Sequence, residues 1–254
     1  MPYIITPVRA FKDNYIWMLH DTKRAWVVDP GDAVPVIEVL QKQNLKLSGI
    51  LLTHHHSDHS GGIPDLLNYA GNIPVYASRQ TKISSVTHPV KENDEIKTKF
   101  GSFKALEIPG HTLDHIAFVG QGLLFCGDTL FSAGCGRVFE GTYVQMFAAL
   151  SKLNALDADI KIYCGHEYTL ANLNFARLVE PKNKAIAEKI AQLEKMEEKI
   201  ACSLPSSLQE ERAINPFLRT REPSIIGAAE QYAQQKLSSP EEVFTVLREW
   251  KNKL

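Results

Sequence analysis

Residues 53–62 read THHHSDHSGG, and this stretch decides how the rest of the chain is interpreted. Four of its side chains are potential metal ligands: His54, His56, Asp58 and His59. The apolar run at 49–52 before them predicts a buried strand. In an extended chain alternate side chains share a face, so the first three ligands would converge. His59 breaks the alternation and would turn toward a second centre. Imidazole and carboxylate together suit zinc, iron or manganese, so the stretch predicts a metal site.

Three further segments each place a histidine or an aspartate just after an apolar run and a glycine. They carry His111, Asp128 and His166 within 109–115, 124–129 and 162–167. This is the pattern of ligands that lie on loops at strand ends. Each segment alone is typical of an ordinary turn, but all four in one chain favour a metal centre assembled from several strands.

Composition and charge narrow the class of protein. The 254 residues are 44% hydrophobic and 22% charged, which predicts a packed globular core in one large or two smaller domains. The formal net charge is −1 without a long basic run, so nucleic-acid binding has little electrostatic support. No apolar stretch approaches the roughly 20 residues of a membrane span, and the first residues do not resemble a secretory signal. We therefore expect a cytoplasmic protein and a monomer.

The four cysteines do not suggest a disulfide framework. Cys126, Cys135, Cys164 and Cys202 form no Cys-x-x-Cys pair. Cys126 and Cys164 end apolar runs, so we expect them to be buried free thiols.

Hydrophobic patterning predicts two regions. Up to about residue 168 strands alternate with helices, which predicts sheets covered by helices. The strands are expected at 15–20, 25–29, 49–52, 75–77, 103–108, 116–119, 123–126 and 161–164, and the helices at 34–43, 64–69 and 144–153. Beyond it we expect helices at 170–178, 184–199 and 240–250, the last capped by Ser238-Ser239. The predicted domains are 1–168 and 169–254.

The order His54-x-His56-x-Asp58-His59, His111, Asp128, His166 resembles the metallo-β-lactamase superfamily. The resemblance implies an α/β fold, an αββα sandwich with a dinuclear metal site at one sheet edge, followed here by an all-helical C-terminal domain. A narrower resemblance, to glyoxalase II or the hydroxyacylglutathione hydrolases, covers nearly the whole chain. Its motifs lie at 11–15, 28–31, 134–142, 164–169 and 215–219.

Carried over by position, the resemblance implies roles for the ligand residues. One metal ion would take His54, His56 and His111; the other would take Asp58, His59 and His166. Asp128 would bridge them, since each carboxylate oxygen can hold a cation. Asp58 and Asp128 are the implied catalytic residues, acting through a metal-bound hydroxide. Asp29 is an implied outer partner that orients a ligand histidine, although it equally suits a turn before Pro30-Gly31.

The resemblance also implies which residues bind the substrate: Arg137, Phe139, Tyr168, Arg248 and Lys251. Without it, Arg248 and Lys251 would be interpreted as solvated residues on one face of a helix. Three residues depart from the family pattern. Ser57 replaces a frequent histidine, Asp114 replaces a usual glycine, and Phe139 replaces a tyrosine that helps to hold glutathione. Aspartate tolerates left-handed backbone, so we expect the turn at Asp114 to persist with some strain.

The function implied by the resemblance is hydrolysis of S-(2-hydroxyacyl)glutathione thioesters. S-lactoylglutathione would give glutathione and lactate, a step of methylglyoxal detoxification. The cofactors would be two divalent metal ions. Zinc is the expected metal, and iron and manganese also fit the ligands. The partner would be this small-molecule thioester, with no nucleic acid and no membrane. The alternative is a mononuclear iron persulfide dioxygenase of the same superfamily, in which Asp58, His59 and His166 would lie mostly outside the ligand set. A superfamily nuclease or lactamase fits less well.

Overall fold

Two six-stranded sheets form the centre of the computed structural model, which describes residues 3–195 and 202–254. The first sheet has the order β1-β2-β3-β4-β5-β6. Its strands are β1 (Ile4–Ala10), β2 (Asn14–His20), β3 (Arg24–Val28), β4 (Lys46–Leu51), β5 (Val75–Ser78) and β6 (His88–Val90). Strands β3 to β6 are parallel, so each connection crosses over rather than forming a hairpin. Helix α1 (Ala33–Gln43) connects β3 to β4, and the short α2 (Ser57–Ser60) and α3 (Ile63–Ala70) lie between β4 and β5.

The second sheet has the order β14-β13-β10-β9-β8-β7. Its strands are β7 (Glu95–Thr98), β8 (Gly101–Glu107), β9 (Ile116–Gly120), β10 (Leu123–Gly127), β13 (Lys161–Cys164) and β14 (Ser206–Ser207). A small hairpin of β11 (Leu130–Phe131) and β12 (Gly134–Cys135) follows β10. Helix α4 (Tyr143–Asn154) then leads to β13, and a capping box between Thr142 and Gln145 begins it.

The sequence of β2 explains why the sheets stack. All seven residues of this strand are buried, and alternate side chains enter different cores. Tyr15, Trp17 and Leu19 join the core that contains Phe103, Phe118 and Phe125 of the second sheet. Ile16 and Met18 join the core that contains Val36 and Leu40 of α1 and Leu66 of α3. A strand buried on both faces thus separates the interior between the sheets from the layer under the helices.

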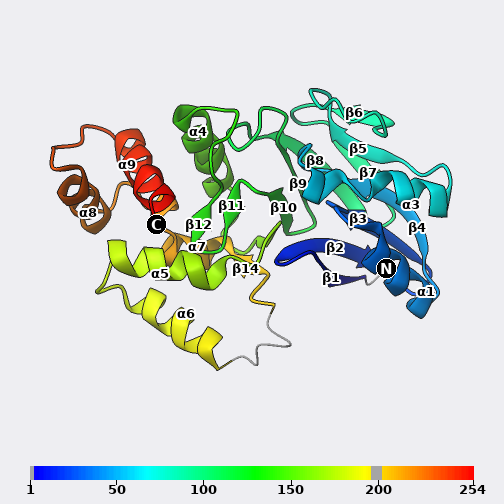
Figure 1. Cartoon of the computed structure of the whole chain (residues 1–254), viewed down its shortest axis with the longest axis horizontal. Helices are drawn as coiled ribbons and strands as arrows, with labels where there is room; N and C mark the ends of the chain where they lie inside the picture. The colour runs from blue at the N-terminus through cyan, green and yellow to red at the C-terminus, as the bar shows by residue number, and fades with distance from the viewer. Residues whose placement is uncertain (1–2, 196–201) are drawn as a thin grey trace.

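The remaining helices gather at the end of the molecule opposite α1 (Figure 1). They are α5 (Thr169–Val179), α6 (Lys184–Glu194), α7 (Leu208–Ile214), the 3₁₀ turn η1 (Pro216–Leu218), α8 (Pro223–Ala233) and α9 (Pro240–Asn252). Ser239 caps α9 through Glu242 N, as predicted. This region also supplies β14, which pairs with β13 of the second sheet.

The predicted fold class is confirmed, and most predicted strands and helices lie within a few residues of their expected positions. The helix expected at 184–199 ends at Glu194, and its last four predicted residues lie outside the described part. Cys126 and Cys164 are buried free thiols, as expected. The domain boundary at residue 168 stays a prediction. Within the described part of the chain, every helix is too short or too polar to span a lipid bilayer.

Candidate metal centre

Strand ends of both sheets bring the predicted ligands together. His54 and His56 follow β4, and Asp58 and His59 lie on α2. The other three follow strands of the second sheet: His111 comes after β8, Asp128 after β10 and His166 after β13. All seven residues therefore lie at one edge of the sandwich.

The first cluster consists of three imidazoles. Nδ1 of His56 lies 3.2 Å from Nε2 of His54 and 3.1 Å from Nε2 of His111. Nitrogens bound to one tetrahedral zinc ion at 2.0–2.1 Å would be roughly 3.3 Å apart. Burial holds the pKa of His54 well below its usual range and lowers that of His111, so both rings favour the neutral form that binds a metal. Spacing and protonation thus both fit a cation.

The second cluster combines a carboxylate with two imidazoles. Nε2 of His59 lies 3.2 Å from Nε2 of His166. Oδ2 of Asp58 is 3.5 Å from the first of these atoms and 3.4 Å from the second. Burial opposes protonation of His166, but Asp128 and Asp58 outweigh it and raise its pKa to about 10. Carboxylates concentrated on this cluster therefore favour positive charge there, which a metal ion would supply.

Asp128 lies between the two clusters. Its Oδ2 is 3.2 Å from Nε2 of His166 and 3.6 Å from Nε2 of His111, and its Oδ1 is 3.4 Å from Nε2 of His59. Oδ1 is buried and has no hydrogen bond within the described residues. A buried carboxylate oxygen without a donor is costly, and a cation would satisfy it. The residues present therefore fit a pair of metal ions.

The grouping expected from strand alternation is wrong for Asp58. The chain stops being extended at His56, which is the residue before the first turn of α2. One helical turn then brings both Asp58 and His59 to His166. The His59 ring also lies beside His54, with ring centroids 4.2 Å apart. The grouping implied by the family resemblance, in which Asp58, His59 and His166 lie together, matches the geometry.

In the buried ligand histidines, the ring nitrogen that faces away from the cluster also has a partner. His111 Nδ1 donates to the carbonyl oxygen of Arg137 at 2.8 Å. His59 Nδ1 lies 3.2 Å from Oδ2 of Asp29, a residue that also accepts hydrogen bonds from the backbone and hydroxyl of Thr53. Asp29 has φ 54° before Pro30, so it is both a turn residue and a neighbour of a ligand histidine.

Two residues that hold the second cluster were not predicted from the sequence. Asp13 Oδ1 lies 2.8 Å from Nδ1 of His166, and Asn14 Nδ2 donates to Oδ2 of Asp58 at 2.9 Å. Asp13 belongs to the turn between β1 and β2, and Asn14 is the first residue of β2. The signal was the short polar pair at the start of a fully buried strand, within the 11–15 motif. Isolated bridge pairing of Asn14 with His166 fixes their position.

A glycine gives the centre room. A Cβ added at Gly165 would lie 2.5 Å from Oδ1 of Asp128 and 2.6 Å from Cε1 of His59. Both contacts are far too short, so any side chain here would displace a residue of the centre.

A cavity of about 530 Å³ opens onto the centre. All five predicted substrate-binding residues line it: Arg137, Phe139, Tyr168, Arg248 and Lys251. The Tyr168 ring stacks on His166 at 4.8 Å, and Phe139 meets His111 edge-on at 5.2 Å. Cations and aromatic rings thus surround the same opening as the ligand residues.

The view of Arg248 and Lys251 as solvated helix residues is wrong. Arg248 is 2% exposed, and its Nη1 donates to the carbonyl oxygen of Cys135 at 2.7 Å. Lys251 donates to Oδ1 of Asn172 and lies 5.8 Å from the centre of the Phe175 ring. Burial, followed by the charges of Arg248 and Arg137, lowers the pKa of Lys251 to about 7. Both cations point into the protein because α9 packs across the cavity wall.

The strain expected at Asp114 is also wrong. Asp114 is absent from the residues with positive φ, so this turn does not use left-handed backbone at that position. Its side chain is buried and accepts a hydrogen bond from Thr112 Oγ1 at 2.7 Å.

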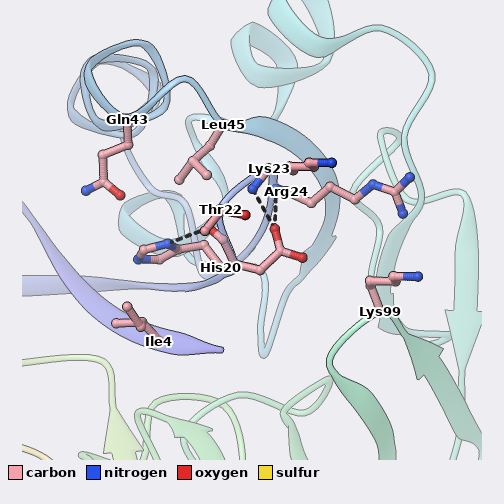
Figure 2. A pocket seen from close by; sticks show the side chains of 9 residues that line it. Ile4, His20, Thr22, Lys23, Arg24, Gln43, Leu45 and Lys99 are labelled. Carbon is pink, nitrogen blue, oxygen red and sulfur yellow. Dashed lines mark hydrogen bonds between the residues drawn. The ribbon is translucent and has the colours of Figure 1, made fainter. Parts of the chain in front are cut away.

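A larger cavity, of about 870 Å³, surrounds the turn between β2 and β3 (Figure 2). The charged ends of Lys23, Arg24 and Lys99 lie on one side of it (Figure 2). It shares no lining residue with the cavity at the metal centre. The volume of a cavity therefore does not identify the functional site in this protein. The site is identified by the convergence of titratable groups.

Comparison with known proteins agrees with the fold and the centre. The two sheets, the strand-end ligands and a match of residues 11–166 to the metallo-beta-lactamase superfamily define the class of this protein. Residues 167–254 match the model of the hydroxyacylglutathione hydrolase C-terminus. The chain belongs to the hydroxyacylglutathione hydrolase family, and the protein is a hydrolase.

Relatives of this family are similar over nearly their full length. A hydroxyacylglutathione hydrolase of Nitrosomonas eutropha is 48% identical over 98% of both chains. One from Aeromonas hydrophila is 47% identical over 98% of this chain and 99% of its own.

Solved structures show that the fold extends further. ETHE1 from Myxococcus xanthus is 23% identical with a TM-score of 0.67, over 98% of this chain and 91% of its own. TTHA1623, crystallised in a di-iron-bound form, is 24% identical with a TM-score of 0.57, over 84% of this chain and 100% of its own. These two similarities concern the fold alone.

Proposed function

We infer that this protein hydrolyses S-(2-hydroxyacyl)glutathione thioesters, with S-lactoylglutathione giving glutathione and lactate. The observation that carries the inference is the position of Asp128. Its carboxylate contacts His166 and His59 on one side and His111 on the other, at the floor of a cavity lined by cations. The identity of the relatives, 48% over nearly the whole chain, supports this substrate class. We place the reaction in methylglyoxal detoxification and the protein in the cytoplasm as a monomer.

We assign the ligands as two sets joined by one carboxylate. His54, His56 and His111 would hold one divalent ion, Asp58, His59 and His166 the other, and Asp128 both. Zinc suits the imidazole-rich first set, and iron or manganese also fit the second. Bound together, two such ions lower the pKa of a shared water and supply hydroxide near neutral pH. Asp29, Asp13 and Asn14 would orient His59, His166 and Asp58, as outer partners of metal ligands do.

The cavity wall would bind the glutathione part of the substrate. Glutathione carries two carboxylates, and buried cations are their natural partners. Arg248 and Lys251 lie on α9, and Arg137 lies on the loop after β12. No carboxylate within the described residues forms an ion pair with these three cations, so their charges are available to a ligand. Tyr168 and Phe139 would contact the substrate beside the metal ligands.

Departure of the leaving group makes few further demands on the side chains of the protein. The leaving group is a thiolate whose conjugate thiol has a pKa around 8.5, by analogy with cysteine. Departure therefore needs no strong general acid. The residues of the chain would hold the thioester carbonyl next to Asp128 and keep the glutathione carboxylates at the far wall.

Purified protein tests the proposal in two assays. Release of free thiol from S-lactoylglutathione should be rapid, and elemental analysis should find two metal ions per chain. A lactoyl thioester of N-acetylcysteamine, which lacks the glutathione carboxylates, is the matched control and should react with a much higher KM. Oxygen uptake with glutathione persulfide, one metal ion and no thiol release would instead favour the dioxygenase alternative. The clustering of Asp58, His59 and His166 argues against that alternative.

A further inference from the structure

His55 lies among the ligand histidines but turns away from the metal centre. Its Nδ1 is 2.9 Å from Oδ1 of Asp114, and its Nε2 is 3.3 Å from Oε1 of Glu140. One imidazole therefore connects two carboxylates through its two opposite nitrogens. We call this arrangement of Asp114, His55 and Glu140 the carboxylate bridge. The Asp114 contact is a hydrogen bond, and the Glu140 contact is a charge contact at ion-pair distance.

The two ends of the bridge belong to different segments. Asp114 follows the loop of His111, and Thr112 Oγ1 donates to its Oδ1 at 2.7 Å. Glu140 lies on the loop between β12 and α4, next to Phe139. Its Oε2 accepts a hydrogen bond from Leu113 N at 2.9 Å, so Glu140 is fixed to the His111 loop directly as well as through His55.

Backbone contacts continue the connection. The amides of Phe139 and Glu140 both donate to the carbonyl oxygen of His111, at 3.2 and 3.3 Å. The loop is also joined to the His111 segment by the carbonyl oxygen of Arg137, which accepts from His111 Nδ1 at 2.8 Å, and by Gly141 N, which donates to Gly110 O at 3.1 Å. The side-chain bonds of Glu140 add to these contacts beside Phe139. The same loop carries Arg137 and Phe139 into the cavity at the metal centre.

The bridge itself does not line that cavity. His55, Asp114 and Glu140 line a separate cavity of about 520 Å³, with Thr81, Ile83 and Leu113. Direct contact with a substrate in the metal-centre cavity is therefore not its role. Asp114 is 5% exposed. Burial of a carboxylate costs desolvation free energy, which hydrogen bonds from donor groups must offset.

We propose that the carboxylate bridge positions the loop carrying Arg137 and Phe139, and that Asp114 and Glu140 are positioning residues for substrate affinity. Only the expected effect on KM rests on the proposed function; the positioning of the loop does not. The bridge would hold the Phe139 ring against His56 and His111, at 5.9 and 5.2 Å, without touching substrate.

Kinetics of single variants provide the first test. Asp114→Ala and Glu140→Ala should each raise KM for S-lactoylglutathione about threefold to tenfold, because each removes a charged acceptor from the carboxylate bridge. The value of kcat should change less than about twofold, because no metal ligand moves. Glu140→Gln keeps an acceptor for Leu113 N and should retain most of the affinity. Asp65→Ala is the control: Asp65 is exposed on α3 and has no hydrogen bond or ion pair within residues 3–195 and 202–254.

A double variant tests the bridge as a unit. Either single change already releases His55, so Asp114→Ala/Glu140→Ala should raise KM little more than the larger single change. If the two contacts were independent, the fold-increases in KM of the two single variants would instead multiply in the double variant. KM values that multiply, or that match the Asp65→Ala control, would overturn the proposal.

Hydrogen exchange separates this proposal from the function. In both single variants the amides of Phe139 and Glu140 should exchange faster, while those of β10 stay protected. If the wild-type protein fails to hydrolyse S-lactoylglutathione, the proposed function is wrong, and faster exchange at Phe139 and Glu140 still supports the bridge. Unchanged exchange at these two amides overturns it. Asp114→Asn, closer in shape, serves for exchange if Asp114→Ala does not fold.

Discussion

Arg248 Nη1 donates a hydrogen bond of 2.7 Å to the carbonyl oxygen of Cys135, and this bond joins the last helix to strand β12 beside the metal centre. The guanidinium also lies 5.2 Å from the centre of the Phe217 ring. Its hydrogen-bond partners among the described residues, Cys135, Gly136 and Asn252, are neutral, so its charge is fixed in place without being cancelled. A fixed and uncancelled cation is well suited to an anionic ligand.

Arg248→Ala should weaken both substrate binding and stability. A desolvated charged hydrogen bond contributes about 1.5–3 kcal/mol, which corresponds to a rise in KM of about tenfold or more. Loss of packing on Phe217 should lower Tm as well. Steady-state kinetics and thermal unfolding check both effects. Arg221→Ala, at an exposed arginine outside this cavity, should change neither, and an unchanged KM in Arg248→Ala would exclude a role for the guanidinium in binding.

The lowered pKa of Lys251, about 7, predicts a pH dependence of binding. Burial is the main cause, and the charges of Arg248 and Arg137 act in the same direction, while the nearby Cys135 thiol opposes them. Lys251 is therefore charged below pH 7 and neutral above it. The value of kcat/KM for S-lactoylglutathione should fall as pH rises through this range, and Lys251→Arg should remove that fall.

The thioester of N-acetylcysteamine controls for effects on the chemical step. It has no glutathione carboxylates, so its kcat/KM should lack the component that Lys251→Arg removes. The same loss with both substrates would show that a different group titrates.

Glu211 predicts a pH dependence of stability. This side chain is fully buried, and burial raises its pKa to about 7, although hydrogen bonds from Ala133 N and Asn215 oppose the shift. The folded state thus binds a proton that the unfolded state, at its ordinary 4.5, releases. The contribution of the neutral acid is complete below pH 4.5 and is lost as pH rises through 7.

Glu211→Gln should flatten the stability profile between these two pH values. The neighbouring titratable groups are the thiols of Cys126 and Cys164, whose raised pKa values keep them protonated there. Urea unfolding at several pH values measures the difference between the two proteins. A Gln variant with the same slope as the wild type would assign the pH dependence to another group.

Asp128→Ala should remove metal from both sets of ligands. Loss of an outer partner typically costs 10–100-fold in metal affinity or activity, so loss of a shared ligand should reduce turnover by at least about 100-fold. Elemental analysis and thiol release measure the two effects. Asp13→Asn, which changes only the partner of His166, provides the comparison and should retain more metal at both sets. Two tightly bound ions and normal turnover in Asp128→Ala would refute the shared-ligand assignment.

The sequence predicted the strand-end ligands because their identity and spacing carry the information. Local alternation failed at Asp58 because a single turn of helix replaced the extended chain, and nothing in Ser57–Ser60 distinguishes four helical residues from a loop. Strand β1 was missed because Pro7 interrupts its pattern. It is an edge strand, where proline is tolerated, and edge position depends on the whole sheet.

Long-range packing set the other limits of prediction. Arg248 has the spacing of an exposed helix residue, and the packing of α9 against β12 and Phe217 buries it. Asp13 contacts His166 across 153 positions of sequence, so no local pattern pairs them. The backbone at Asp114 is outside the left-handed region, and its side chain contacts Thr112 and His55, a pairing that no local pattern predicts.

The pairing of β14 with β13 has a consequence for the chain during its synthesis. Ser206 and Ser207 occupy the outer edge of the second sheet opposite Ile162 and Lys161. They are made long after β13, so a growing or truncated chain ending near residue 168 would present that edge unpaired. Unpaired edges recruit strands from other molecules. In the folded protein the helical region thus covers an edge that would otherwise be open to strands of other molecules.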